Sequence, residues 1–286
     1  MNVRSFTGRW IAGLVISLLV WAGPIHAKTS VWKVTGPAGR VLYLGGSQHR
    51  LKSTDYPLPP SYNRAFDLSQ RLAFEESPED STGAAKRLEK SGVYPKGDEL
   101  RNHVDPRTYE YVTKVFGRFR LSVDKLARCR PWFLVYLLSA GRGGPGVESY
   151  FAERARTHGR SIEGLESNHE HLQVFSGMTD RQSEAFLLVT LIQAKSDSRP
   201  DAAKLTAAWR GGDPDYLERN LRAAFRDFPA MSDRLLSVRN RAWIPKLESW
   251  IRSGQTYFVL AGAAHMGGPN GLLTLLRQRG YQIEQW

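Results

Sequence analysis

The sequence predicts an α/β fold with a central, mostly parallel sheet that is built from N- and C-terminal segments and flanked by helices. Short apolar runs of the kind that form buried strands gather at the two ends of the chain. Between them, roughly residues 100–252 show helical patterning with capping residues, which predicts a long helical insertion. No stretch rich in Gly, Ser and Pro separates two units, so we expect residues 28–286 to form a single domain.

The first 27 residues have the order of a signal peptide. Arg4 and Arg9 precede an uncharged apolar run over residues 11–23, and the small residue Ala27 follows. The run spans about 13 residues, which is shorter than the ~20 that a transmembrane helix needs. We therefore expect cleavage after Ala27 and a mature protein that is periplasmic or secreted.

This expectation can be tested directly. N-terminal sequencing of the protein recovered from its native envelope should begin close to Lys28, because signal peptidases cut after a small residue. Recovery of intact Met1 in the membrane fraction would contradict cleavage and favour an anchored form.

Composition limits the classes of partner. The net charge is +12, and +10 once Arg4 and Arg9 are removed with the leader. A basic protein attracts anions such as phospholipid headgroups, which makes association with the envelope surface one expectation. Acidic residues are mixed with the basic ones along the helical stretches and no nucleic-acid-binding motif occurs, so we expect no nucleic-acid partner. Cys129 is the only cysteine, which excludes an intramolecular disulfide.

The individual elements are expected from local signals in chain order. Strand-like runs lie at residues 31–34, 41–44, 71–74, 161–165, 257–260 and 282–286. Helices are expected from Pro59 to Leu68, from Asp105-Pro106 through Phe116, after the capping box Thr179-Asp-Arg-Gln182, after Asp213-Pro214, from Ser232, and from Asn270 to Gly280.

A short self-similarity links two of the expected strands. Val41-Leu-Tyr-Leu-Gly-Gly46-Ser-Gln-His49 and Tyr257-Phe-Val-Leu-Ala-Gly262-Ala-Ala-His265 both read as an apolar strand, a small residue, Gly, two short residues and His. Gly-x-x-His alone is a weak motif, but both copies stand at the same distance from the end of a strand. The carboxyl ends of parallel strands open on the crevice where α/β sheets bind ligands, so both histidines are candidate site residues.

Glu75 is expected at the same edge of the sheet for a different reason. The runs at 41–44 and 71–74, joined by the expected helix from Pro59, form a βαβ unit, so we expect their strands to be parallel neighbours. His49, Glu75 and His265 would then come from three strand ends and suit a divalent metal ion, with a further carboxylate as ligand or base. Each of the three residues alone could instead be a packing or surface residue.

Further segments carry a resemblance to a known family. They are Val31-Trp32, Leu44-Gly-Gly-Ser-Gln-His49, Leu72-Ala-Phe-Glu75, Arg130-Pro131-Trp132, Gly146-Val-Glu148, Gly164-Leu165-Glu166, Trp209-Arg-Gly-Gly-Asp213, Arg239-Asn240 and Val259-Leu-Ala-Gly262-Ala-Ala-His265-Met-Gly-Gly-Pro269. With these segments the chain resembles the TraB/GumN family, which is related to the Tiki metalloproteases and more distantly to erythromycin esterase and ChaN-like proteins. The chain departs from the family pattern at three places. Glu76-Ser77 follows Glu75 where the family usually has one residue and then Asp, Glu148 stands where Asp is usual, and His171 stands where Gln is common.

The resemblance implies an exported metal-dependent hydrolase of the peptidase type that acts on a periplasmic peptide or small-molecule substrate. It implies that His49, Glu75 and His265 hold a divalent ion such as Mn, Co or Zn. Glu166 is then a fourth ligand or general base, and Arg239 and Asn240 bind an oxyanion or orient a ligand. The alternative is a non-catalytic periplasmic protein that binds haem or a metal, or an accessory factor in polysaccharide production.

The remaining motif residues are expected to have structural roles. Trp209 and Asp213 are interpreted as a packing residue and a helix cap. Four further histidines stand in polar contexts and are expected to be solvated: His103, His158, His169 and His171.

Overall fold

A computed structural model describes residues 28–77, 83–118, 126–139, 144–194 and 200–286. The expected signal peptide, residues 1–27, therefore lies outside the described residues. Within the described part of the chain, no helix is both long enough and apolar enough to cross a membrane.

The centre of the structure is a six-stranded, mostly parallel sheet with the order β6-β4-β7-β2-β1-β8. The four strands β6, β4, β7 and β2 are parallel to one another, and β1 is antiparallel to both β2 and β8. Their bounds are β1 Val31–Thr35, β2 Val41–Ser47, β4 Arg71–Glu76, β6 Ile162–Glu166, β7 Tyr257–Gly262 and β8 Gln282–Gln285. The predicted α/β class and all six predicted strand positions are confirmed.

One predicted neighbourhood is wrong. We expected β2 and β4 to pair, because helix α1 (Pro60–Asp67) connects them, but β7 lies between them and pairs with both. β7 is buried over Tyr257 to Ala261, and such a continuously apolar strand is typical of the interior of a parallel sheet that is covered on both faces. The predicted parallel direction holds, and Ser47 of β2 stands level with Gly262 of β7.

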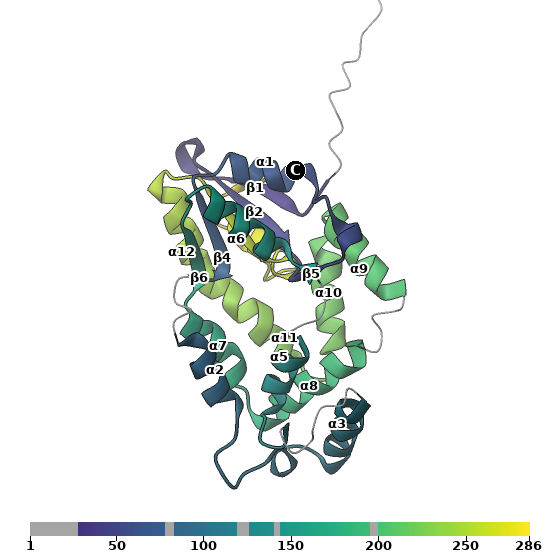
Figure 1. Cartoon of the computed structure of the whole chain (residues 1–286). Helices are drawn as coiled ribbons and strands as arrows, with labels where there is room; N and C mark the ends of the chain where they lie inside the picture. Colours follow the sequence, from purple (N-terminus) through teal and green to yellow (C-terminus); the bar gives the residue numbers. More distant parts are fainter. Residues whose placement is uncertain (1–27, 78–82, 119–125, 140–143, 195–199) are drawn as a thin grey trace, which may run out of the picture.

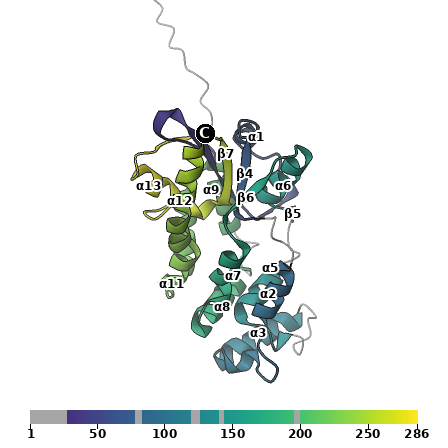
Figure 2. The ribbon, with the colours of Figure 1, turned by 90° about the vertical axis from the view of Figure 1, so that its left-hand side faces the viewer.

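Helices cover both faces of the sheet, as the views in Figures 1 and 2 show. Alternate residues of each strand point to opposite faces, so Leu42 and Leu44 pack on one side and Tyr43 on the other. The first side is covered by α12 (Val238–Ser253) and α13 (Leu272–Arg277), and the second by α1 and α6 (Val147–Thr157). The resulting three layers hold the strand ends in fixed positions.

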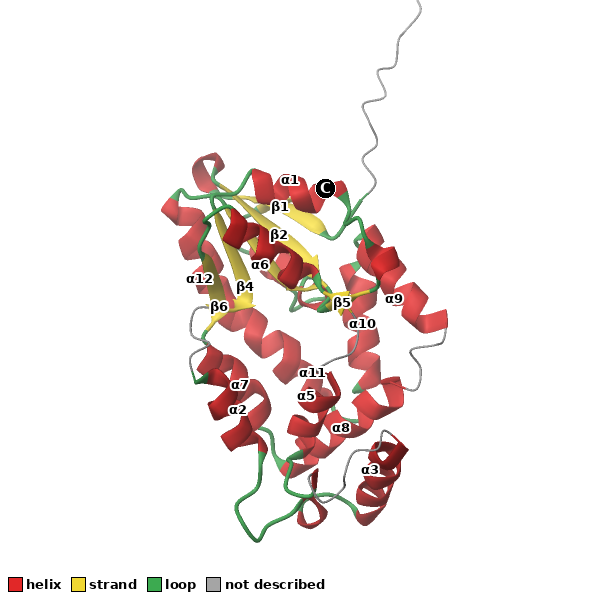
Figure 3. Ribbon diagram, viewed as in Figure 1, coloured by secondary structure: helices red, strands yellow, loops and turns green. Residues whose placement is uncertain are grey.

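A separate helical region lies next to the carboxyl ends of β4 and β6, below the sheet in Figure 3. Its apolar cluster includes the buried residues Tyr94, Phe116, Trp132 and Leu187. Apart from α6 and α12, the helices described between β4 and β7 are α2 Ala84–Gly92, α3 Pro106–Arg118, α5 Pro131–Ser139, α7 Asn168–Ser176, α8 Asp180–Ala194, α9 Pro200–Gly211, α10 Pro214–Ala224 and α11 Pro229–Ser232. A two-stranded sheet of β3 (Arg50–Leu51) and β5 (Gly144–Pro145) connects this region to the first Gly-x-x-His segment.

Most helix-start signals are confirmed at the level of hydrogen bonds. Thr179 and Gln182 form the reciprocal capping box of α8, and the Asp213 carboxylate accepts the Tyr216 amide at the start of α10. Ser232 does not open a helix but ends α11, because Pro229 already occupies the first turn. The last helix begins at Leu272, two residues after the predicted start at Asn270.

His103 links the start of α8 to the loop before α3. Its Nε2 lies 2.7 Å from Asp98 and its Nδ1 lies 2.8 Å from Asp180, while its ring stacks on Tyr94 at 4.0 Å between centroids. Carboxylates only accept hydrogen bonds at neutral pH, so both contacts are favourable only when both ring nitrogens carry protons. The expectation that His103 is simply solvated is therefore wrong.

The His103 contacts predict a pH dependence of stability. Burial alone would lower the pKa of His103, but Asp180 and Asp98 outweigh it and hold the pKa above the ordinary 6.5. A raised folded-state pKa contributes stability below about 6.5 that is lost as pH rises through the folded value. Thermal unfolding at pH 6 and pH 9 should show a larger loss of stability for the wild type than for His103→Gln. Equal losses in the two proteins would contradict this role.

Candidate functional site

Five buried polar residues meet at the carboxyl edge of the sheet. Glu75 and Glu166 stand at the ends of β4 and β6, His265 lies in the short helix η6 (Ala263–His265) directly after β7, and Arg239 and Asn240 lie in the first turn of α12. Each of the five is at most 8% exposed. The structure therefore brings together all the sequence-predicted site residues except His49.

A π-helical turn sets the direction of Arg239 and Asn240. The turn, Asp233–Ser237, immediately precedes α12, and such insertions change the phase of a helix and are frequent at functional sites. Beyond it, α12 buries the stripe Trp243, Ile244 and Leu247 against the sheet. Arg239 and Asn240 form the polar end of the same stripe, so the helix delivers them to the strand ends.

Arg239 joins the two carboxylates. Its Nη2 donates to Glu75 Oε2 at 2.5 Å and to Glu166 Oε1 at 2.6 Å, and its Nε donates to Glu166 Oε2 at 3.2 Å. Trp243 Nε1 also donates to Glu166 Oε2, at 3.1 Å. Burial opposes a charge on Arg239, but the two carboxylates raise its pKa above the ordinary value. The guanidinium is thus the fixed positive charge of the site.

Asn240 fixes the orientation of His265. Its amide nitrogen donates to two backbone carbonyls, those of His265 at 3.1 Å and Asn270 at 2.8 Å, so its oxygen faces His265 Nδ1 at 2.6 Å as an acceptor. His265 therefore carries its proton on Nδ1, and its Nε2 presents a lone pair. Nε2 lies 3.7 Å from Glu75 Oε1 and 3.3 Å from Arg239 Nη1. Burial lowers the pKa of His265 to about 3, which keeps the imidazole neutral.

The two oxygens of Glu75 have different surroundings. Oε1 accepts a hydrogen bond from the backbone of Gly262 at 2.7 Å and faces His265, whereas Oε2 is bound to Arg239. Burial alone would raise the pKa of Glu75, but the charge of Arg239 outweighs it and holds the pKa below its usual range. Glu75 is therefore an ionised carboxylate with one oxygen directed toward His265.

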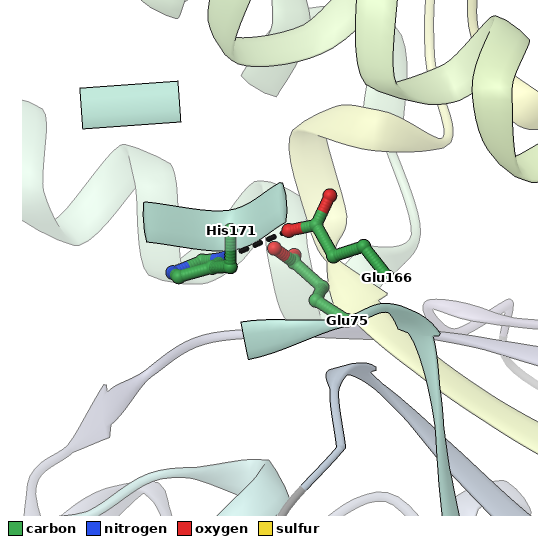
Figure 4. A group of neighbouring side chains, drawn as sticks. All are labelled: Glu75, Glu166 and His171. Carbon is green, nitrogen blue, oxygen red and sulfur yellow. Dashed lines mark hydrogen bonds and ion pairs between the residues drawn. The ribbon is translucent and has the colours of Figure 1, made fainter. Parts of the chain in front are cut away.

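His171 belongs to this site, contrary to the expectation that it is solvated. Its Nδ1 lies 2.6 Å from Glu166 Oε1, as Figure 4 shows, and 3.4 Å from Arg239 Nη2. One ligand atom each from Glu75, Glu166 and His171 lie within 4.8 Å of one another. Arg239 Nη2 contacts all three of these residues, so the guanidinium already supplies the positive charge between them. By contrast, His169 is exposed as predicted.

His49 stands at the same edge but has a different partner. Its Nδ1 lies 3.1 Å from Glu148 Oε1, and its side chain is 73% exposed. The hydrogen bond and charge of Glu148 raise the pKa of His49 above its ordinary value. Ser47 pairs with Gly262 in the adjacent strand, so the two Gly-x-x-His segments leave the sheet side by side, although the hydrogen-bonding partner of His49 is Glu148.

The turn of the first Gly-x-x-His segment is held by two buried aromatic residues that were not predicted as site residues. The Gly46 carbonyl accepts hydrogen bonds from the Tyr62 hydroxyl and, at 2.8 Å, from Trp209 Nε1. Trp209 is fully buried, so its predicted packing role is confirmed and this contact with the motif is added to it. No sequence spacing links these residues, because the contacts depend on how α1 and α9 pack on β2.

Comparison with known proteins identifies relatives of the chain. Residues 30–285 match the TraB/PrgY/gumN family. A protein of Treponema pallidum (strain Nichols), described as an uncharacterized protein, is 24% identical over 279 residues, which cover 89% of this chain and 82% of the relative. No solved structure matches the chain. Because the family match extends over nearly all of the sequence, including every residue of the site, this chain belongs to the TraB/PrgY/gumN family.

Proposed function

We propose that this protein is an exported, divalent-metal-dependent hydrolase of the peptidase type, with its centre at Glu75 and His265. The observation that carries the proposal is the pairing of a neutral imidazole nitrogen with an ionised carboxylate oxygen, 3.7 Å apart and buried at the sheet edge. Both atoms are oriented by partners of their own, Asn240 for His265 and the Gly262 amide for Glu75. Open α/β sheets bind their ligands at this edge.

The donor atoms fit a divalent ion such as Mn, Co or Zn. A metal-ligating histidine is neutral and usually donates its other N–H to an oxygen acceptor, which is the arrangement of His265 and Asn240. Two ligands of one ion at bond lengths of about 2.0–2.2 Å lie within roughly 4 Å of each other. Arg239 Nη1 contacts the same Nε2 at 3.3 Å, so a metal ion would compete with that hydrogen bond.

The other residues of the site have roles that follow from their contacts. Each oxygen of Glu166 has two hydrogen-bonding partners, which leaves it little capacity as a ligand or base and makes it the anchor of Arg239. Arg239 balances both carboxylates and can stabilise negative charge that develops on a substrate carbonyl oxygen. Asn240 holds the His265 tautomer. A bound metal would polarise a carbonyl and lower the pKa of its water toward neutrality.

We propose a peptide or small acyl compound of the periplasm as the substrate class. The support for this class is the resemblance to the metalloprotease branch of the family, and the support for export is the residue order of the leader, residues 1–27.

The proposal is tested with a fluorescence-quenched peptide library. Chelator-treated protein should be inactive, addition of Mn²⁺, Co²⁺ or Zn²⁺ should restore hydrolysis, and Glu75→Gln should abolish it. His169→Gln serves as the control, because His169 is exposed on α7 and should leave activity unchanged. Metal binding without hydrolysis of any library member would favour the alternative of a metal-binding accessory protein. The proposal would be refuted if the protein neither bound a metal ion nor hydrolysed any peptide of the library.

A further inference from the structure

Glu148 connects two residues of the first Gly-x-x-His segment. Its Oε1 accepts a hydrogen bond from the Ser47 hydroxyl at 2.5 Å and lies 3.1 Å from His49 Nδ1. Ser47 is 3% exposed, whereas the side chains of Glu148 and His49 are 19% and 73% exposed. The three side chains therefore run from the core to the surface, with the imidazole at the outer end.

The backbone around Glu148 is tied to the backbone of the motif. The Val147 amide donates to the Gln48 carbonyl at 3.1 Å, and Arg50 pairs with Pro145 in the two-stranded sheet. A Cβ at Gly146 would lie 2.4 Å from the His49 carbonyl carbon, so this position requires glycine. The segment that delivers Glu148 is thus packed directly on the segment that carries His49.

The chemistry of this pair differs from that of His265. With Nδ1–H donated to a carboxylate, His49 keeps Nε2 for proton exchange, which is how an acid–base histidine is oriented in hydrolases. His265 and Glu75 are buried and close together, but the hydrogen-bonding partner of His49 is Glu148 and its ring faces solvent. Ser47 and Gly262 are paired in adjacent parallel strands, so both motifs leave the sheet side by side.

We propose that His49 is the proton-transfer residue of this centre and that Glu148 is the residue that positions it. The inference rests on the proposed hydrolase function. In its protonated form, His49 donates Nε2–H to the leaving nitrogen or oxygen as the scissile bond breaks, and Nε2 takes up the proton that the attacking water loses as the new C–O bond forms. The imidazole ends as it began, and one water has been added across an amide or ester bond.

If His49 transfers protons and is not a metal ligand, its replacement should slow turnover without weakening metal binding. His49→Gln should lower kcat by about 10²–10⁴-fold, the usual contribution of a general acid–base group, while Zn²⁺ affinity measured by calorimetry stays unchanged. A fall in Zn²⁺ affinity comparable with that of His265→Gln would make His49 a metal ligand and overturn the assignment. Unchanged kcat would overturn it as well. Absence of hydrolysis in the wild type would instead refute the proposed function.

The positioning role of Glu148 can be tested by spectroscopy without any substrate. In ¹⁵N-histidine spectra recorded above the raised pKa of His49, the neutral ring of the wild type should carry its proton on Nδ1, and Glu148→Met should shift the proton toward Nε2. Glu148→Met should also lower kcat at least tenfold with little change in KM, and Glu148→Gln, which keeps an acceptor, should fall between the two. Melting curves of the variants show whether each protein is folded. An unchanged His49 tautomer in folded Glu148→Met would contradict the positioning role.

Discussion

Replacing Arg239 by methionine should lower the free energy of unfolding by about 3–5 kcal/mol at pH 7, the range seen when one partner of a buried ion pair is removed. The variant leaves Glu75 and Glu166, both at most 8% exposed, without the guanidinium that donates three hydrogen bonds to them. Arg241→Met is the matched control, since Arg241 is an exposed residue of the same helix. Denaturant unfolding at pH 7 measures the free energy of unfolding of both variants.

In Arg239→Met, the contribution of Glu75 to the free energy of unfolding should also change its pH dependence in sign. In the wild type the pKa of Glu75 is held below its usual range, so its contribution is present above about pH 4.3 and is lost on acidification. Without Arg239, burial raises that pKa, and the variant should gain stability between pH 7 and pH 5 as Glu75 takes up a proton. An unfolding free energy within about 0.5 kcal/mol of the wild type at pH 7 would contradict a buried charge network.

The second large effect is expected in metal affinity. Asn240→Leu removes the acceptor that orients His265, and such losses typically lower metal affinity by about 10–100-fold. His265→Gln removes the ligand itself and should lower Zn²⁺ affinity by more than this. The Glu75→Gln/His265→Gln double variant should bind scarcely more weakly than either single variant, because ligands of one ion act as a unit. Additive losses would contradict a shared ion, and His169→Gln should have no effect.

The strands and the direction of their carboxyl ends could be predicted because the signals are local. Runs buried on both faces must be apolar, and small residues must follow where the chain turns at a strand end. These two requirements place Glu75 and His265 at one edge without any knowledge of the packing. Arg239 and Asn240 came instead from the family resemblance, because nothing in a helical stretch indicates which polar residue will be buried.

The rest depends on contacts between distant segments. The insertion of β7 between β2 and β4 overrides the local βαβ argument, because a strand from the C-terminal part completes the sheet. His171 stands five residues after Glu166 in a polar stretch with a capping box, and only the path of α7 turns it toward the strand end. Glu148 reaches His49 through the β3–β5 pairing, for which two-residue strands give no sequence signal.

An anomalous-scattering map of crystals grown with Zn²⁺ tests the central claim most directly. The account predicts a peak about 2.0–2.2 Å from both Glu75 Oε1 and His265 Nε2, with Arg239 still bound to Glu166. A map with no peak at that position, from crystals of protein that hydrolyses its substrate, would contradict a metal centre at Glu75 and His265.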